Sequence, residues 1–531
     1  MNASMPPAAE PAVKDPDYVD SLERGLSVLR AFSMREGAFS VADLAAFVGI
    51  TRTAARRFAL TLEHLGYTFQ SAAGYALAPG VLAIGDAYLR SNPLPDAAHP
   101  QLEEIVRAVG ETASLTVLHK RRVYYTARVA ADRIITANIT LGTSVPAYST
   151  ATGRVLLGGL DPDELEEYLS TIEPASGFDP DYVRARIAEA REQGWAAADQ
   201  ELTTGIRSVA VPLRDPEQRI IAALNISAHA TRVSTSMLEA DFVPLLQAAG
   251  QRTAATLWPG PGPAPRRPAA ASAYAVRPIA RPTDAIQSVE RGLCILTAFD
   301  EAHPAMNLAQ ISERCRLPRS AARRFVRTLA SLGYLAPQGR SFVPTPQILE
   351  LGYSLLPRLS LADVAKPRLE VLARKLGASV SIGVLEGLDL RYVARVSAPS
   401  PLTVNIRAGS RVPAHRTAMG QVLLSLLPPE ALQDGASSTA ADSAGEGLAE
   451  LDDTLEAVRE QGWSYVDQLL EVGIRAVAVP LRNRRGEVVA ALSASLHEAS
   501  TSGNDMVSTF LPALRTAADE FVMDLRDGLN L

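Results

Sequence analysis

The stretch SLERGLSVLRAFSMREGAFSVADLAAFVGITRTAARRFALTLEHLGY, residues 21–67, decides the fold of this chain. Its first thirteen residues place apolar side chains at helical spacing, and Ser40 and Thr51 stand where two further helices would need their N-caps. Gly49 follows the second of these helices, as glycine often follows a helix C-terminus. Three helices with a glycine-containing turn between the last two predict a helix-turn-helix.

Two short β-like runs around Gly74 follow directly and predict a hairpin wing over residues 67–79. The third helix carries its arginines in the N-terminal half, the end that a recognition helix points into the major groove. Arginine can form paired hydrogen bonds with guanine edges or bridge phosphates. For one isolated helix, an ordinary solvated face would explain these arginines equally well.

The arrangement occurs twice, however, because nearly the whole chain is duplicated. SLERGL at 21–26 recurs as SVERGL at 288–293, and GIRSVAVPLR at 205–214 recurs as GIRAVAVPLR at 473–482, with offsets of 267 and 268 residues. A register kept over this distance means two copies of one unit. We therefore expect contacts to double-stranded DNA from both copies, made by Thr51, Arg52, Thr53, Arg56, Arg57, Arg319, Ser320, Arg323, Arg324 and Arg327.

The second part of each unit has a mixed pattern. Residues 80–91 predict a joining helix, with residues 347–358 as its counterpart. Five or six strand-like runs follow, among them RIITANIT at 133–140, and helical stretches interrupt them before a last helix at 238–257. This mixture indicates an α+β domain with an antiparallel sheet, and a sheet covered on one side leaves a concavity suited to a small ligand.

These patterns give the expected domain organisation. The first copy comprises a disordered tail, a winged helix-turn-helix, a linker helix and an effector-binding domain, at 1–17, 18–79, 80–94 and 95–258. A Pro/Ala-rich linker at 259–284 precedes the second copy, whose three parts are expected at 285–346, 347–360 and 361–531. A polar segment at 436–447 of the second copy is expected to be a mobile loop.

Composition excludes several classes of protein. The chain has 531 residues, 47% hydrophobic and 21% charged, which excludes a mostly disordered chain. We find no apolar run of about 18 residues and no signal-peptide pattern, and so expect no membrane segment. With two cysteines, neither a disulfide scaffold nor a thiolate metal site is expected. We expect a cytosolic protein without metal or cofactor.

The charge balance needs to be considered by region. The net charge of −6 alone argues mildly against nucleic acid as a partner. Residues 21–78, however, hold six arginines against four acidic residues, and residues 288–345 hold eight against four. The DNA-facing parts are therefore basic, and the acidic surplus lies elsewhere.

Catalytic motifs are absent from the sequence. It contains no nucleophile elbow, no phosphate-binding GxxxxGK[ST] loop and no HExxH, and its seven histidines are scattered. We therefore expect no catalytic residue. Three alternatives to a DNA-binding protein with two ligand-binding sensors stay open. They are an enzyme that uses the sensor pocket, a metabolite-binding or scaffolding protein whose DNA-binding parts have lost function, and a DNA-binding protein whose second sensor is only an internal dimerisation module.

Taken together, SLERGL, TRTAARRF, LGY, PAYSTATGRVLL, QGW and GIRSVAVPLR resemble the IclR family of bacterial transcriptional regulators over nearly the whole of each copy. The subgroup that governs protocatechuate, 4-hydroxybenzoate and β-ketoadipate catabolism is the most similar. The resemblance implies a winged helix-turn-helix dimer on a palindromic operator, with a GAF-like domain that senses a small, usually acidic metabolite. It also implies a protein of the bacterial cytoplasm that lies at the nucleoid when bound to DNA.

The resemblance also implies effector-binding positions. In the first copy they are Ala151, Thr152, Asp199, Ser208, Asn225 and Ser227, and in the second copy Ala418, Met419, Asp467, Ser493 and Ser495, with Ala476 in place of Ser208. Backbone amides in a loop of small residues, together with hydroxyl or amide side chains, can hold a carboxylate. The alternative is that these small residues only allow the sheet and a helix to pack closely.

Differences between the copies lead to two hypotheses. Met419 stands where the first copy has Thr152, so the two pockets either bind different ligands or one of them binds none. Because one chain carries both DNA-binding parts, an intramolecular pseudo-dimer is expected, with a dimer of fused chains as the alternative. The recognition helices also differ at their tips, with Thr53 against Ser320 and Ala59 against Val326.

Overall fold

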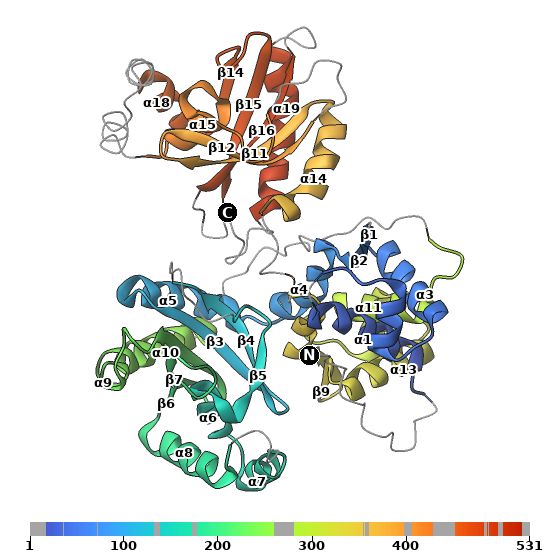
Figure 1. Cartoon of the computed structure of the whole chain (residues 1–531), viewed down its shortest axis with the longest axis vertical. Coiled ribbons are helices and arrows are strands. Elements are labelled where there is room, and N and C mark those ends of the chain that lie inside the picture. Colours follow the sequence, from blue (N-terminus) through green and yellow to red (C-terminus); the bar gives the residue numbers. More distant parts are fainter. Residues whose placement is uncertain are drawn as a thin grey trace. The chain divides into compact units, whose positions relative to one another are not determined.

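The computed structural model divides into two compact units, Met1–Pro357 and Arg358–Leu531 (Figure 1). The first unit contains both winged helix-turn-helix modules and the first sensor domain, and the second unit contains the second sensor domain. The structure describes residues 17–35, 37–71, 73–131, 139–172, 178–259, 281–353, 355, 361–397, 406–427, 452–482, 486, 488–497 and 503–522. The expected tail at 1–16, most of the linker, the strand at 133–138 and the loop at 436–447 lie outside these residues.

The first winged helix-turn-helix, called the first head (residues 18–79), has the predicted order of elements. It consists of α1 (Asp20–Met34), α2 (Val41–Val48), α3 (Arg52–His64), β1 (Thr68–Ser71) and β2 (Gly74–Leu77). Both predicted caps are confirmed, because Ser40 accepts a hydrogen bond from the Asp43 amide and Thr51 accepts one from the Ala54 amide. Gly49 has φ +73°, in the left-handed region that favours glycine.

The second head (residues 285–346) repeats this order. It consists of α11 (Gln287–Thr297), α12 (Leu308–Arg314), α13 (Arg319–Leu332), β9 (Leu335–Gln338) and β10 (Ser341–Pro344). Its caps differ in detail. Asn307 forms a capping box with Gln310 at the start of α12, whereas Pro318 precedes α13 without a side-chain cap.

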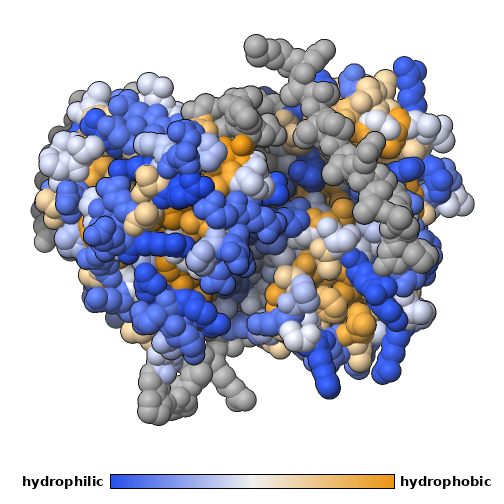
Figure 2. Space-filling model, turned by 90° about the horizontal axis from the view of Figure 1, so that it is seen from below, coloured by the Kyte–Doolittle hydropathy of each residue, from blue (hydrophilic) through white to orange (hydrophobic). Residues whose placement is uncertain are grey.

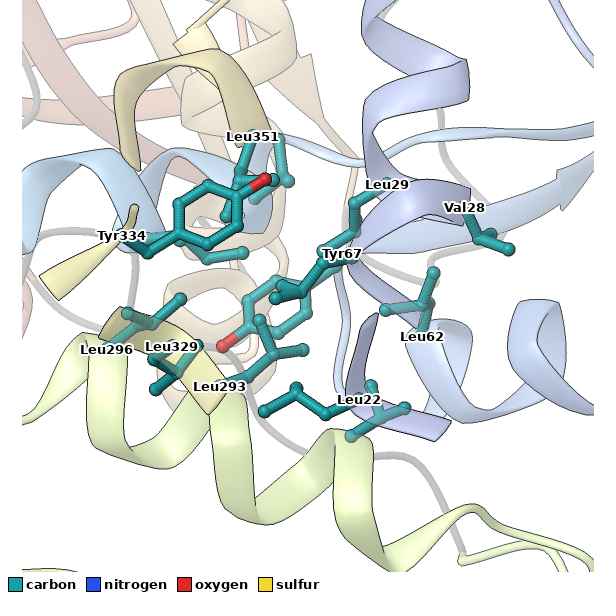
Figure 3. Close-up of a cluster of buried hydrophobic side chains, with 14 of the residues drawn as sticks. Leu22, Val28, Leu29, Leu62, Tyr67, Leu293, Leu296, Leu329, Tyr334 and Leu351 are labelled. Carbon is teal, nitrogen blue, oxygen red and sulfur yellow. The ribbon is translucent and has the colours of Figure 1, made fainter. Parts of the chain in front are cut away.

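One continuous hydrophobic core joins the two heads (Figure 3). In the close-up, Leu22, Leu29 and Tyr67 of the first head lie beside Leu293 and other apolar side chains of the second head. All four side chains are buried. Burying apolar surface stabilises a folded protein by about 25 cal/mol per Å². Separating the two heads would expose this surface to water and would therefore be unfavourable.

Two glycines allow α1 and α11 to cross closely at the centre of this core. A Cβ atom added at Gly25 would overlap the side chain of Val289, and one added at Gly292 would overlap the side chain of Leu22. Beside the crossing, the hydroxyl oxygens of Ser21 and Ser288 lie 2.6 Å apart. Ser21 and Ser288 are equivalent positions of the two copies. In the two glycine contacts, the partner lies one helical turn from the equivalent position.

Hydrogen bonds at the edge of the interface are reciprocal. The Val19 amide donates to the Thr328 hydroxyl at 3.0 Å, and the Ile286 amide donates to the Thr61 hydroxyl at 3.0 Å. Val19 and Ile286 are equivalent positions, as are Thr61 and Thr328, 267 residues apart. The two heads are therefore related by a pseudo-two-fold axis within one chain, which is the arrangement of a symmetric dimer interface.

The first sensor domain (residues 95–258) is a six-stranded antiparallel sheet with helices on both faces. The strand order is β5 (Ser144–Pro146), β4 (Arg122–Val129), β3 (Thr112–His119), β8 (Ile220–His229), β7 (Ile206–Arg214) and β6 (Ala196–Asp199). One face packs against α5 (Leu94–Val109) and α10 (Val243–Leu257), the latter after a π-helical turn, η4 (Leu238–Phe242). The other face packs against α6 (Ala151–Leu157), with α7 (Pro162–Ser170) and α8 (Pro180–Gln193) beyond it. Each face thus has its own apolar core.

The second sensor domain repeats the sheet with the order β13 (Arg411–Pro413), β12 (Asp389–Val396), β11 (Ser379–Glu386), β16 (Val488–His497), β15 (Ile474–Arg482) and β14 (Ser464–Asp467). One face packs against α14 (Leu361–Leu376) and α19 (Gly503–Val522), and the other against α15 (Ala418–Leu424) and α18 (Asp452–Gln461). The expected α+β class with antiparallel sheets is confirmed in both copies.

The joining helices differ between the copies. After η1 (Pro79–Val81), α4 (Leu82–Ser91) forms where a helix is predicted. In the second copy the prediction of a helix over 347–360 is wrong for its first part, which is a 3-10 helix, η5 (Pro346–Leu351). Gly352 ends η5 and packs against the backbone carbonyl of Val81, at a distance that leaves no room for a Cβ atom. This packing against the first copy favours a short 3-10 segment over a continuous α-helix.

The crossing of α1 and α11 makes a prediction about stability. Gly25→Leu forces a side chain into the space that Val289 occupies, and we expect the free energy of unfolding to fall by about 1–3 kcal/mol in urea denaturation. The matched control is Arg24→Leu, which places the same side chain at an exposed position of α1 and should change stability by less than about 0.5 kcal/mol. Equal stability of the two variants would show that the helices do not cross at Gly25.

Candidate DNA-binding and effector-binding sites

The side chains expected to contact DNA all lie at the surface of the two recognition helices. The ten positions Thr51, Arg52, Thr53, Arg56, Arg57, Arg319, Ser320, Arg323, Arg324 and Arg327 are exposed. The opposite side of each helix is buried, with Phe58 and Leu62 of α3 in the shared core. The helices therefore present their arginines away from the core.

Three of these arginines contact the residue that directly precedes the opposite head. Arg57 donates through Nε to the Asp284 carbonyl at 3.3 Å, and Arg324 donates in the same way to the Asp17 carbonyl at 3.4 Å. Arg327 Nη1 lies 3.3 Å from Oδ2 of Asp17. These side chains hold the segment that precedes the first helix of the other head, so part of their hydrogen-bonding capacity is used inside the protein.

Arg52, Arg56, Arg319 and Arg323 differ in this respect. The part of the chain that the structure describes offers them no hydrogen bond or ion pair. Exposed guanidinium groups at the N-terminal half of a recognition helix can contact bases or phosphates without first breaking an internal contact.

The expectation that Ala59 and Val326 lie at the tips of the recognition helices is wrong. Ala59 and Val326 are completely buried in the shared core, so they are not exposed at helix tips. The larger Val326 changes packing rather than a DNA contact. Thr53 and Ser320, the other differing pair, are exposed.

The first sensor domain contains a pocket over the sheet, beside the start of α6, with about 430 Å³ of space not filled by atoms, which includes open solvent at its mouth. Four of the predicted effector-binding residues line it, namely Thr152, Ser208, Asn225 and Ser227. Asn225 is only 1% exposed, and its Nδ2 donates to the Ser227 hydroxyl at 3.0 Å. Its Oδ1 has no partner among the described residues. A buried amide oxygen without a donor costs free energy unless a ligand or water satisfies it.

The equivalent pocket of the second sensor domain has about 540 Å³ of space not filled by atoms, which includes open solvent at its mouth. Ala418, Met419, Ser493 and Ser495 line it as predicted, together with Ala476. The side chain of Met419 is 2% exposed and occupies the position of Thr152. The second pocket therefore has the same place in the fold but a less polar lining at these positions.

Ala151, Asp199 and Asp467 do not line the pockets. Asp199 and Asp467 lie at the edge strand of each sheet, exposed, and accept hydrogen bonds from cross-strand arginines, Arg207 at 2.7 Å and Arg475 at 3.0 Å. Hydrogen bonding to the arginine holds the pKa of each carboxyl below its usual range. The pairing stabilises the sheet edge and keeps these two aspartates out of the pockets.

Close packing explains part of the loop of small residues. A Cβ atom at Gly153 would overlap the Ala147 carbonyl, and one at Gly420 would overlap the Ala414 carbonyl. Glycine at this position is thus required by the close approach of the backbone segment just before the helix, which is a contact within the loop and not between the sheet and the helix. The neighbouring Thr152 does line the pocket, so packing and ligand contact are divided between adjacent residues.

Sequence reasoning missed the residues that β4 and β12 contribute. Tyr125 lines the first pocket, and Tyr392 and Arg395 line the second. All come from the repeat pair YTARV and YVARV, in which tyrosine and arginine recur in register. That recurrence was the signal available. Tyr392 and Arg395 are three residues apart and would face opposite sides of a regular strand, but a shift in register at Val393 brings both to the pocket.

A polar junction connects the first sensor domain to both heads. Glu350, on η5, accepts hydrogen bonds from the hydroxyls of Tyr124 at 2.7 Å and Ser144 at 3.2 Å. Its other carboxylate oxygen lies 3.8 Å from Nε of Arg30, on α1. Burial, and then the Glu350 charge, raise the pKa of Tyr124, so this hydroxyl stays protonated and donates.

A second contact of the same domain reaches the end of a recognition helix. Lys120 Nζ donates to the Leu332 carbonyl at 3.4 Å, and Nε2 of His119 lies 3.2 Å from the Gly333 carbonyl oxygen. These carbonyls belong to the C-terminus of α13, where a positive charge is favourable. The turn between β3 and β4 therefore holds the C-terminal end of the second recognition helix.

Other kinds of site are not found in the described part of the chain. It contains no group of three or more histidine, cysteine, aspartate or glutamate residues that could hold a metal ion. It also has no helix that is long and apolar enough to cross a membrane. On the face shown in Figure 2, hydrophilic side chains predominate and hydrophobic ones form separate patches, as is usual for folded proteins in water.

Two family descriptions match the sequence, each of them twice. The IclR helix-turn-helix domain matches residues 21–71 and 288–339. The C-terminal domain of the bacterial transcriptional regulator IclR matches residues 86–255 and 353–522. Together these matches cover most of the chain and agree with the duplication.

Each of the following relatives matches a part of this chain about as long as one copy. The Pca regulon regulatory protein of Pseudomonas putida is 40% identical over 243 residues, 45% of this chain and 84% of that protein. The p-hydroxybenzoate hydroxylase transcriptional activator of Acinetobacter baylyi is 31% identical over 256 residues, 45% of this chain and 92% of that protein. A crystal structure of a transcriptional regulator from Rhodococcus sp. RHA1 shares 40% identity, with a TM-score of 0.42, over 45% of this chain and 97% of that one. These relatives are named as regulators of transcription and not as enzymes.

The exposed arginines make a prediction about DNA binding. The double variant Arg56→Ala/Arg323→Ala should bind the DNA upstream of the protein's own gene at least 100-fold more weakly in a gel shift, because one unpaired guanidinium is lost from each head. Its urea unfolding curve should match that of the unchanged protein. The matched control, Arg57→Ala/Arg324→Ala, removes contacts between the heads and should lower stability. Unchanged DNA affinity of the first variant would overturn the assignment.

Proposed function

This chain belongs to the IclR family of bacterial transcriptional regulators, and on that premise we propose that it controls genes for the catabolism of an aromatic or β-ketoadipate-type acid. It is a ligand-responsive regulator that acts through double-stranded DNA and a small-molecule effector. Its two heads would read two half-sites of one operator, and a small organic acid would be the signal.

The observation that carries the proposal is the reciprocal interface of the two heads. It fixes two exposed recognition helices relative to each other inside one chain, which supports the simultaneous binding of two half-sites. Thr53 faces solvent in one helix where Ser320 does so in the other, and the wings carry QSAAGYA and PQGRSFV. The half-sites are therefore expected to be imperfect repeats, about one helical turn apart or a multiple of it.

The chemistry of the effector rests on the pockets and on the named relatives. Two relatives are called regulators of the Pca regulon and of p-hydroxybenzoate hydroxylase, and this chain is 40% and 31% identical to them. The pockets combine hydroxyl and amide groups with tyrosine rings, which suits a small acid carrying an aromatic or extended apolar body. Candidate effectors are thus p-hydroxybenzoate, protocatechuate and β-ketoadipate.

The junction at Glu350 supplies a route from the first pocket to the heads. Tyr125 lines that pocket, and the residue before it, Tyr124, donates a hydrogen bond to Glu350. If the ligand binds more tightly when β4 occupies one of two slightly different places, binding would shift β4 and change the hydrogen bond between Tyr124 and Glu350. The relative populations of two arrangements of the heads would change with it. Regulation would then follow from differential affinity for the two arrangements.

DNA binding itself is tested with the unchanged protein. A gel shift on the DNA upstream of its own gene should show affinity that falls steeply with salt, since phosphate contacts release counterions. Footprinting of the same complex should protect two half-sites. A single contiguous half-site, or a complex without salt dependence, would contradict the proposal and favour a metabolite-binding or scaffolding protein.

The coupling route predicts the behaviour of a single hydroxyl deletion. Tyr124→Phe removes the donor to Glu350, so the effect of p-hydroxybenzoate on operator affinity should shrink at least fivefold while its own affinity changes less than twofold. Gel shifts with and without ligand, and calorimetry without DNA, measure the two quantities. Tyr182→Phe, a surface change on α8 of the same domain, is the control and should retain the full effect. A full ligand effect in Tyr124→Phe would exclude this route.

A further inference from the structure

The two pockets occupy the same place in the fold but differ at the positions that meet a ligand. Three substitutions remove polar groups from the second pocket, where Thr152, Ser208 and Asn225 of the first pocket become Met419, Ala476 and Ser493. The loss comprises two hydroxyls and a carboxamide, replaced by a thioether, a methyl group and one hydroxyl. A ligand with several hydrogen-bonding substituents would find fewer partners there.

The first pocket, in contrast, is lined by a buried hydrogen-bonding group without a partner among the described residues, the Oδ1 atom of Asn225. The hydroxyl of Ser114, directly opposite Asn225 on the neighbouring strand, also has no partner there, although Ser114 is not among the residues that line the pocket. Both residues are at most 1% exposed. Whichever way the Asn225 amide is oriented, one of its polar atoms faces no partner among the described residues, so a hydroxyl group of a ligand can pair with it as donor or acceptor.

A cation lines the second pocket beside these positions. Arg395 lines it from β12, and its Nη1 donates to the hydroxyl of the buried Ser381 at 3.2 Å. Its counterpart in the first copy, Arg128, is also an arginine but is not among the residues that line the first pocket. The Nε atom of Arg395 is buried and has no partner among the described residues. Burial lowers the pKa of Arg395, since desolvation disfavours the charged form. An anion beside this guanidinium would restore the lost hydrogen bonding and charge balance.

Other charges around the second pocket leave Arg395 available to an anion. Arg416 lines the pocket and is exposed, with Nε bound to the Leu469 carbonyl at 2.8 Å. Glu471 also lines it and is exposed. In the first pocket the position of Leu469 is Glu201, which forms an ion pair with the buried Arg154. The second pocket thus lacks that carboxylate and carries two arginines against one glutamate.

We propose that the second pocket binds a monocarboxylate with an unsubstituted apolar body, with its carboxylate on Arg395 and Ser381 and its apolar part against Met419. The first pocket binds a hydroxylated acid whose hydroxyl group pairs with Asn225. One chain would then respond to two related acids that differ in hydroxylation. This inference rests on the proposed function only in taking both pockets as effector sites.

The test uses calorimetry on the full chain without DNA, with benzoate and p-hydroxybenzoate as probes. Each probe should bind with one strong site per chain. Arg395→Gln should weaken benzoate binding at least tenfold and leave p-hydroxybenzoate binding unchanged. Asn225→Ser should do the reverse. Arg395→Lys keeps the charge and should restore part of the benzoate affinity, and thermal unfolding of each variant checks that the domain is folded.

A gain of function completes the design. The triple variant Met419→Thr/Ala476→Ser/Ser493→Asn gives the second pocket the first pocket's side chains and should create a second site for p-hydroxybenzoate. Benzoate binding that survives Arg395→Gln, or that is lost with Asn225→Ser, would overturn the proposal, as would a second pocket that binds neither probe. Because gel shifts on the upstream DNA measure the heads separately, failure here leaves the proposed DNA-binding function standing.

Discussion

The close crossing of α1 and α11 at Gly25 and Gly292 is the constraint on which the rest of the structure depends. It brings the apolar sides of two winged helix-turn-helix modules into one core, so that each head is completed by the other. The segments before these helices then reach the opposite recognition helix, where Arg57 and Arg324 hold them. Family members of one copy's length would need two chains to supply two such heads. Here the second head is tethered, and pairing is independent of protein concentration.

Fusion also permits asymmetry that two identical chains cannot have. Glu350 accepts hydrogen bonds from Tyr124 and Ser144, but its counterpart in the first copy is Ala83, which has no polar side chain. The counterpart of Tyr124 is Arg391, and this arginine forms an ion pair with Glu386 of its own domain. The same side-chain junction therefore cannot form with the roles of the copies exchanged. The two pockets also differ, because the two copies in one chain can change independently of each other.

Local sequence signals predicted the parts of the fold that depend on local physics. Ser40 and Thr51 cap helices as expected, because a cap is decided by a hydrogen bond within three residues. The family resemblance named positions of which four line the first pocket and five, with Ala476, line the second; their role in effector binding stays a prediction. The role of Asp199 could not be seen in this way, because a cross-strand arginine, eight residues later, decides it. Likewise, the short strands β5 and β6 have too few residues for an alternating pattern, and the burial of Ala59 and Val326 depends on the other head.

The number of chains on one operator tests the central claim most directly. Sedimentation of the protein on a duplex that carries both footprinted half-sites, at nanomolar concentration, measures the mass of the complex. The account predicts one chain of 56.5 kDa per duplex, with both half-sites protected at this stoichiometry. A complex that forms only with two chains, each protecting one half-site, would show that the heads of one chain do not act as a pair.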